Sequence, residues 1–167
     1  MKLRNSILAL VVLGVLGFAG YAALFTSTPA PGVTFTSLKG ERVSTADLRG
    51  HVVLVNFWAT DCPTCVKEMP SMVTTYNKYR KDGLELVAVA MRHDPPNYVI
   101  NYAEKNALPF RVALDPMGEL ASAFGDVKLT PTTIVIDKRG NIVSRILGEP
   151  DFAKLNALIE QKLAEPV

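Results

Sequence analysis

Two cysteines three positions apart are the residues of this chain best suited to chemistry. Cys62 and Cys65 are the only cysteines, and they form a Cys-x-x-Cys motif. The motif follows the apolar run 52–57 and opens a segment with helical periodicity, so Cys62 is predicted to lie in the first turn of a helix. The unpaired N–H groups and the dipole of a helix N-terminus favour a thiolate, which should lower the pKa of Cys62. Pro63 suits the first helical position, where its missing N–H costs nothing. Cys65 lies on the same face, so the pair supplies a nucleophile and a resolving thiol that can close a disulfide.

A structural disulfide and half of a zinc site are the other uses of such a pair. A disulfide across three residues restricts the unfolded chain little. Zinc takes four ligands, and the two histidines, His51 and His93, have no spacing typical of zinc ligands. The position of the motif between a buried strand and a helix favours redox catalysis. We therefore expect the disulfide itself to be the redox group, with no metal and no other cofactor.

The rest of the chain predicts the elements that must position the motif. Strands are expected as two short pieces within 33–48, and at 52–57, 84–91, 132–136 and 142–147; helices are expected at 62–80, 97–106, 119–124 and 151–163. Alternating strands and helices followed by a hairpin imply a mixed central sheet with helices on both faces. The predicted fold class is α/β, a three-layer sandwich with an N-terminal β-hairpin.

The helix after the motif is predicted to pack on the sheet through one apolar stripe. Val66, Met69, Val73 and Tyr76 recur at steps of three and four residues. Pro70 lies inside this helix, where it removes a backbone donor and is expected to produce a kink.

An apolar segment near the N-terminus predicts a membrane anchor. Residues 7–25 are 19 positions without a charge, and Lys2 and Arg4 precede them. At about 1.5 Å per residue, a helix of this length reaches about 28 Å, close to the thickness of the hydrocarbon core. The basic residues should stay in the cytoplasm. Residues 1–25 are thus predicted to be a single-pass anchor, with a cleaved signal peptide as the alternative.

Either interpretation places the rest of the chain on the periplasmic side of the cytoplasmic membrane. Residues 26–32 are rich in Pro and Thr and are predicted to be an extended linker. Residues 33–167 are predicted to be the folded domain, since a hydrophobic content of 49% can build a core. The formal net charge of the chain is only +2, and acidic and basic residues are equal in number beyond residue 25. We therefore expect no nucleic-acid partner.

The segment FWATDCPTCVKEMP at 57–70 resembles the active site of the TlpA/ResA-like branch of the thioredoxin superfamily. The similarity runs from about Thr34 to the end of the chain and includes DLRGHVVLVN at 47–56 and LTPTT at 129–133. The resemblance implies a thioredoxin-like fold and a periplasmic thiol–disulfide oxidoreductase that is anchored by one N-terminal helix and acts mostly as a disulfide reductase. Cytochrome c maturation is a common task of this branch. The implied partners are protein disulfides and a membrane electron donor. The sequence has no obvious oligomerisation feature, so we expect a monomer.

The resemblance also implies roles for individual residues. Cys62 would be the attacking thiol and Cys65 its buried partner. Pro131 would be the cis-proline beside the disulfide, which leaves the backbone of Thr130 free to bind an extended substrate segment. Trp58 would pack near the thiols and contribute to substrate binding, with plain core packing as its alternative.

Carboxylates close to the motif are candidates for proton handling and for tuning the thiols. Glu68 matches an acid that this branch often uses for the proton of the second cysteine; the alternative is a solvated helix residue. Asn56 stands where thioredoxin has a buried aspartate, and it cannot act as a base. Asp61 stands where an aromatic residue is frequent, and its carboxylate should raise the pKa of Cys62 and make the pair more reducing. His51 replaces a frequent lysine and is expected at the surface.

Two other functions stay open. The first is a copper or zinc carrier that uses the two thiolates. The second is a peroxiredoxin-like peroxidase, which the N-terminal hairpin would suit, although the Pro-x-x-x-Thr-x-x-Cys frame is absent from the sequence. The physiological substrate is also open, between an apocytochrome, a copper-site assembly protein and a general set of periplasmic disulfides.

Overall fold

The apolar run before the cysteine motif forms the central strand of the sheet. The computed structural model describes residues 28–167, so the predicted anchor at 1–25 lies outside the described residues. Strand β4 (Val52–Trp58) is buried at every position, as expected for a strand that is covered on both faces. Between residues 28 and 167, no helix is both long enough and apolar enough to cross a membrane.

Apart from β1 (Thr28–Pro29) and β6 (Arg111–Leu114), the other elements agree with the predicted ones, with small shifts of their ends. The strands are β1, β2 (Thr34–Thr36), β3 (Arg42–Ser44), β4, β5 (Leu84–Ala90), β6, β7 (Thr132–Ile136) and β8 (Asn141–Leu147). The helices are α2 (Pro63–Tyr79), α3 (Pro96–Lys105), α4 (Glu119–Ala123) and α5 (Phe152–Ala164), and a short 3₁₀ helix, η1 (Arg80–Asp82), follows α2. Asp151 caps α5, as predicted, by accepting hydrogen bonds from the first backbone N–H groups of that helix.

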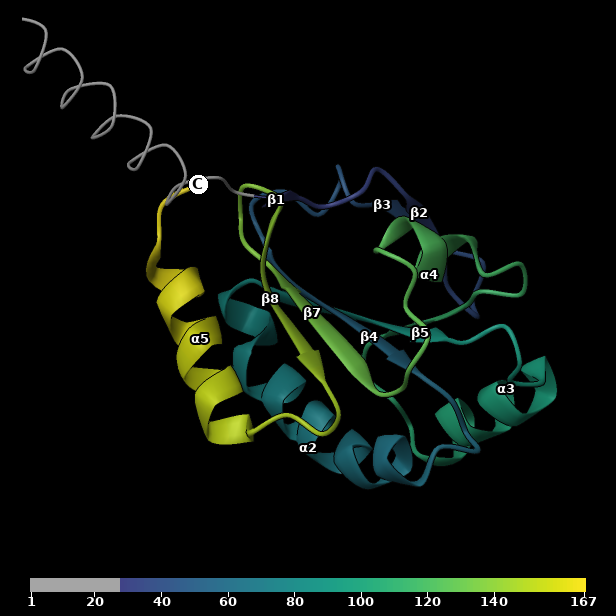
Figure 1. Cartoon of the computed structure of the whole chain (residues 1–167). Coiled ribbons are helices and arrows are strands. Elements are labelled where there is room, and N and C mark those ends of the chain that lie inside the picture. Colours follow the sequence, from purple (N-terminus) through teal and green to yellow (C-terminus); the bar gives the residue numbers. More distant parts are fainter. Residues whose placement is uncertain (1–27) are drawn as a thin grey trace, which may run out of the picture.

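Six strands form one mixed sheet in the order β1-β8-β7-β4-β5-β6, and β2 and β3 form a separate antiparallel hairpin. In this sheet β4 is parallel to β5 and antiparallel to β7. The cysteine motif follows the carboxyl end of β4, an inner strand of the sheet, so it lies where the parallel strands end and near the middle of the sheet (Figure 1). The predicted mixed sheet, with helices on both faces and an N-terminal hairpin, is confirmed.

Alternation along β4 sends its side chains into two separate cores. The even-numbered apolar residues pack with residues of α2, α3 and α5. The odd-numbered residues pack with α4 and the β2–β3 hairpin. Figure 1 shows the same layers, with α2, α3 and α5 on one side of the sheet and α4 with the hairpin on the other. Because Asn56 is also even-numbered, its side chain lies on the same face of the sheet and points toward α2.

Two short strands are missing from the sequence prediction. Strand β6 extends the sheet beyond β5 in a parallel register. Strand β1 lies inside the segment 26–32, which was predicted to be a linker. Thr28 pairs with Ile142 and Pro29 with Asn141 of β8. The prediction of an extended backbone was correct at these two residues, but they belong to the sheet and not to a free linker.

The buried face of α2 differs from the predicted stripe. Of that stripe only Met69 is buried, whereas Val66, Val73 and Tyr76 are half-buried. The buried residues of α2 are Cys65, Glu68, Met69, Met72, Thr75 and Tyr79. Compared with the prediction, the buried face of α2 is thus shifted by one position, so that it includes Cys65 and Glu68. Pro70 lies in the interior of α2 and is exposed, and the helix continues past it.

Candidate active site

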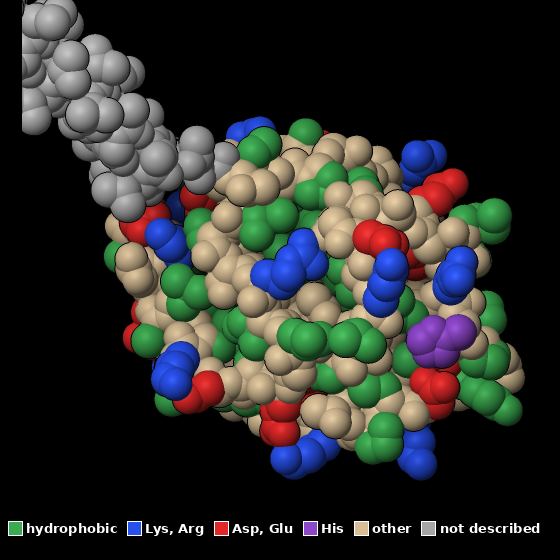
Figure 2. Space-filling view, in the orientation of Figure 1, with side chains coloured by type: hydrophobic (Ala, Val, Ile, Leu, Met, Phe, Trp, Pro, Cys, Tyr) green, Lys and Arg blue, Asp and Glu red, His purple; other side chains and the backbone are tan. Residues whose placement is uncertain are grey.

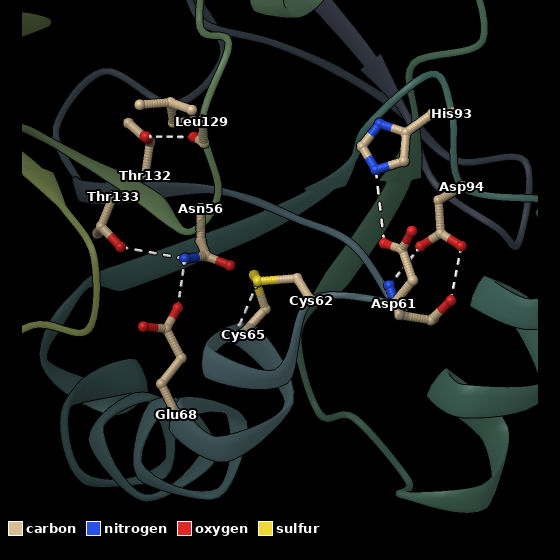
Figure 3. The surroundings of a disulfide bond; sticks show 11 residues. Asn56, Asp61, Cys62, Cys65, Glu68, His93, Asp94, Leu129, Thr132 and Thr133 are labelled. Carbon is tan, nitrogen blue, oxygen red and sulfur yellow. Dashed lines mark hydrogen bonds and ion pairs between the residues drawn. A yellow bond between two sulfur atoms is a disulfide. The ribbon is translucent and has the colours of Figure 1, made fainter.

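The cysteine motif lies where β4 passes into α2. Cys62 is the N-cap residue of α2, with extended backbone angles of φ −95° and ψ 105°, and Pro63 is in the first turn. The two cysteines form a disulfide, with 5.2 Å between their Cα atoms (Figure 3). Sγ of Cys62 accepts a hydrogen bond from the backbone N–H of Cys65 at 3.2 Å. This is the geometry that the sequence predicted, a disulfide in contact with the N–H groups of a helix N-terminus.

The two sulfur atoms differ in access to solvent. Cys62 is half-buried, whereas Cys65 is 0% exposed. This difference supports the predicted order, in which Cys62 meets the incoming disulfide first. The Cys62 thiolate would attack one substrate sulfur, form a mixed disulfide and release the other sulfur as a thiolate. Attack by Cys65 on Cys62 then releases the second substrate sulfur and restores the Cys62–Cys65 bond.

Glu68 is buried one turn after Cys65 and is 0% exposed. Its Oε1 accepts a hydrogen bond from Nδ2 of Asn56 at 2.9 Å, and the same Nδ2 donates to Oγ1 of Thr133 at 3.0 Å. Asn56 and Thr133 lie opposite each other where β4 pairs with β7, so the sheet holds the amide that orients the carboxyl group (Figure 3). The alternative of a solvated glutamate at position 68 is wrong.

Burial changes the proton affinity of Glu68. Loss of hydration raises its pKa from 4.5 to about 7; the hydrogen bond from Asn56 opposes this rise, and the charge of Glu149 adds slightly to it. Oε2 of Glu68 has no hydrogen-bond partner within the described residues. A carboxyl group that titrates near neutral pH can both take and return a proton there. This is the property that the predicted proton-handling role of Glu68 requires, and the role itself stays a prediction.

The loop that leads into β7 runs beside the disulfide. The Thr130–Pro131 peptide bond is cis, as the resemblance implied. Phe57 pairs with Thr132, which brings Pro131 close to the end of β4 where the chain turns toward the cysteines. Pro131 is buried and Thr130 is half-buried. Figure 3 places Leu129 and Thr132, on either side of this dipeptide, in the surroundings of the disulfide. Binding of a substrate backbone by Thr130 stays a prediction.

Trp58 is a core residue. It is 0% exposed and belongs to the same buried cluster as Cys65. Its ring packs against Tyr102, with 5.2 Å between the ring centroids. Trp58 thus packs in the core near the cysteines, and its contact with substrate stays a prediction.

Asp61 points away from the body of the protein. Its side chain is 72% exposed, and Oδ1 lies 3.5 Å from Nε2 of His93 (Figure 3). Water and salt screen a charge at such a position, which limits its effect on Cys62. The predicted rise of the Cys62 pKa through Asp61 therefore stays a prediction, with a small expected size.

One buried carboxylate near the motif was not found from the sequence. Asp94 is 5% exposed and lies in the loop between β5 and α3. Its two oxygens accept hydrogen bonds from the backbone N–H and the hydroxyl group of Thr60, each at 2.6 Å. No sequence pattern links these residues, which are 34 positions apart. The available signal was their common place just after the carboxyl ends of two parallel strands, where functional groups of α/β sheets gather.

The two histidines lie apart from each other and from any group of metal ligands in the part of the chain that the structure describes. Within residues 28–167, no three His, Cys, Asp or Glu side chains are grouped so as to hold a metal ion. His51 precedes β4 and His93 follows β5, so the two histidines lie at opposite ends of parallel strands. His51 is half-buried, and its Nδ1 has no hydrogen-bond partner in the described part of the chain. On the face seen in Figure 2, acidic and basic side chains are interspersed.

A redox disulfide at a helix N-terminus, placed directly after the central strand of this mixed sheet, defines a thioredoxin-fold thiol–disulfide oxidoreductase. Residues 26–159 match the model of the Redoxin family. The chain belongs to this family.

The names of similar proteins agree with this class. The chain is 33% identical over 162 residues to thiol-disulfide oxidoreductase ResA of Bacillus thuringiensis subsp. konkukian, an alignment that covers 93% of this chain and 92% of the relative. It is 36% identical over 155 residues to the ResA of Geobacillus kaustophilus, with coverages of 89% and 87%. Among solved structures, a thiol:disulfide interchange protein of the thioredoxin family from Chlorobium tepidum TLS superposes with a TM-score of 0.76 at 31% identity, over 83% of this chain and 97% of that chain. The chain is thus a thiol–disulfide oxidoreductase.

Proposed function

We propose that this oxidoreductase works as a disulfide reductase on the periplasmic side of the cytoplasmic membrane. Cys62 opens the substrate disulfide, Cys65 resolves the mixed disulfide, and a membrane partner returns two electrons to the pair. The redox group is the cysteine pair itself, without an added cofactor.

The observation that supports the reducing direction is the burial of the Glu68 carboxyl group. Its pKa of about 7 leaves it partly ionised at neutral pH, one turn from Cys65. A negative charge in a buried environment disfavours a second negative charge on a neighbouring sulfur. The reduced form is then less stable, and a less stable dithiol gives up its electrons more readily. Asp61, which precedes Cys62, acts in the same sense from the solvent side.

The reduction potential of the full chain tests the direction. The protein is equilibrated with glutathione or dithiothreitol mixtures, and the oxidised fraction is measured after acid quenching and alkylation. A value near or below about −270 mV, that of thioredoxin, is expected of a reductase. A value near about −120 mV, that of the periplasmic oxidant DsbA, would make the protein a disulfide donor and refute the proposed direction.

The proposed attachment to the membrane depends on residues 1–25 acting as a single-pass anchor. Retention of this segment supports it, and the intact mass of the protein extracted from membranes measures it directly. If the anchor is retained, the expected mass is that of the whole chain, 18.2 kDa. A smaller, water-soluble product would indicate a cleaved signal peptide and refute the anchor. Sedimentation of the detergent-extracted protein tests the proposed monomer.

The proposed substrates are oxidised apocytochromes in cytochrome c maturation, with disulfides of metal-site assembly proteins as the second choice. The resemblance of the 57–70 segment to the TlpA/ResA-like branch supports this assignment. Reduction of an oxidised Cys-x-x-Cys-His peptide, the haem attachment motif, is compared with that of glutathione disulfide. Faster reduction of the peptide is expected. Equal rates would indicate a reductant without this preference.

A further inference from the structure

Two loops meet beside the cysteine pair, and one buried carboxylate joins them. Loop 59–62 carries Cys62 out of β4, and loop 91–95 leads from β5 to α3. Asp94 in the second loop is 5% exposed. Its Oδ2 accepts a hydrogen bond from the backbone N–H of Thr60, and its Oδ1 accepts one from the hydroxyl group of Thr60, each at 2.6 Å (Figure 3). Both oxygens of this buried group are therefore committed to a single residue of the cysteine loop.

These contacts fix the start of the cysteine loop. Hydrogen bonds to a carboxylate are stronger than those between neutral groups, and burial strengthens them further. Backbone bonds continue on either side, from Met91 N–H to the carbonyl oxygen of Trp58 at 3.0 Å and from Cys62 N–H to that of Ala59 at 3.3 Å. Thr60 is thus held through both its backbone and its side chain, two residues before Cys62.

We propose that Asp94 is a positioning residue for the thiol–disulfide reaction, acting through Thr60 to hold Cys62 at the N-cap of α2 when the disulfide is reduced. In the oxidised protein the S–S bond fixes the sulfur of Cys62. After reduction that bond is gone, and Sγ keeps its hydrogen bond from Cys65 N–H only while the loop backbone stays in place. The Thr60–Asp94 contacts keep it there, so the thiolate remains on the N–H groups that stabilise it.

The hydrogen bonds of Asp94 and its negative charge change the pKa of the Cys62 thiol in opposite directions. Positioning lowers the pKa of the Cys62 thiol, whereas a nearby negative charge raises it. Thr60 separates the two effects, because a Thr60 variant can break the hydroxyl contact and leave every charge in place. Such a variant also leaves unchanged the titratable side chains near the cysteine pair, among them Asp61, Glu68 and His93 (Figure 3) and the ion pair of Lys67 with Glu149.

The pKa of Cys62 in the full chain carrying Cys65→Ser tests the proposal, measured from the pH dependence of alkylation by iodoacetamide. Thr60→Val has the same shape without the hydroxyl group. It is expected to raise the pKa by about half a pH unit or more, which slows alkylation about threefold at pH values below the pKa. Thr60→Ser keeps the hydroxyl group and should match the parent. An unchanged pKa in Thr60→Val would overturn the proposal even if thermal stability falls, because a merely structural contact affects stability alone.

A double-mutant cycle tests whether the effect depends on Asp94. In an Asp94→Ala background the partner of the hydroxyl group is already absent, so Thr60→Val should leave the Cys62 pKa unchanged. An equal shift in both backgrounds would assign the effect to Thr60 alone and remove Asp94 from the proposal. If Asp94→Ala does not fold, Asp94→Leu, which is close in size and has no hydrogen-bonding group, is used in its place, with the same two outcomes.

Discussion

Replacing Glu68 by glutamine is expected to change how the stability of the oxidised protein depends on pH. In the folded chain, loss of hydration raises the pKa of this carboxyl group from 4.5 to about 7. Unfolding returns the side chain to water and to its ordinary pKa. Between pH 4.5 and about 7 the folded state therefore holds a proton at Glu68 that the unfolded state has released.

The sign and the size of the effect follow from this difference. Because the folded state binds more protons, the free energy of unfolding falls as pH rises through this window, with a slope of up to about 1.4 kcal/mol per pH unit. The interval between 4.5 and about 7 corresponds to at most about 3 kcal/mol. Solvent near the half-buried Cys62 screens part of it, and we expect about 2 kcal/mol. The contribution of Glu68 is most favourable below pH 4.5 and least favourable above about pH 7.

Urea unfolding of the full chain in a mild detergent, at pH values from about 5 to 8, measures this slope. Glu68→Gln keeps the oxygen that accepts from Asn56 and carries no charge. It should match the wild type near pH 5 and be more stable by about 2 kcal/mol near pH 8. Glu104→Gln changes an exposed glutamate of α3 and should follow the wild-type curve. If Glu68→Gln keeps the wild-type slope, or is less stable than the wild type near pH 8, the reasoning is refuted.

Three further results are expected. Cys62→Ser should abolish reduction of any disulfide peptide, whereas Cys65→Ser should accumulate the mixed disulfide at Cys62, detected by intact mass; residual turnover by Cys62→Ser would contradict the assigned order of attack. Asp61→Asn should lower the pKa of the Cys62 thiol by a few tenths of a pH unit, and more at low ionic strength, measured by alkylation rates. If both that pKa and the reduction potential stay unchanged, Asp61 has no tuning role. Leu155→Ala, at a position 1% exposed on α5, should lower the free energy of unfolding by about 2–5 kcal/mol, and the half-buried Leu158→Ala by less, both measured in urea.

Local pattern is sufficient to predict the frame of the active site. The uninterrupted apolar run predicts β4, and the change to helical periodicity after Cys62 predicts α2. The place of Pro63 in the first turn follows from the rules for helix ends, whereas Cys62, predicted to lie in that turn, is the N-cap residue just before it. The cis peptide bond before Pro131 follows only from the resemblance, since Thr-Pro-Thr by itself fits a turn or a strand edge equally well.

The buried face of α2 depends on a contact that hydropathy does not record. Its inner side includes Cys65, Glu68 and Thr75, and the most regular apolar stripe lies one position away. The hydrogen bond from Asn56 to Glu68 makes burial of an acid acceptable, and that bond joins residues 12 positions apart. The Thr60–Asp94 contact escapes prediction for the same reason.

The two missed strands are too short to show a pattern. Strand β6 has four residues and β1 has two, fewer than alternation needs to be recognised. Each exists because a longer neighbour in the sheet supplies its hydrogen-bond partners.

Strand β1 also affects how the protein behaves among its own copies. An open sheet edge offers unpaired N–H and C=O groups to any other chain, and such pairing leads to aggregation. Here one edge ends in a two-residue strand whose Pro29 has no N–H to donate. At the other edge, Ser37 bridges to Ala113 and the N–H of Leu38 donates to the carbonyl oxygen of Val112. The second edge is therefore partly closed to strand addition, whereas at the first edge β1 covers only Asn141 and Ile142 of the seven-residue strand β8.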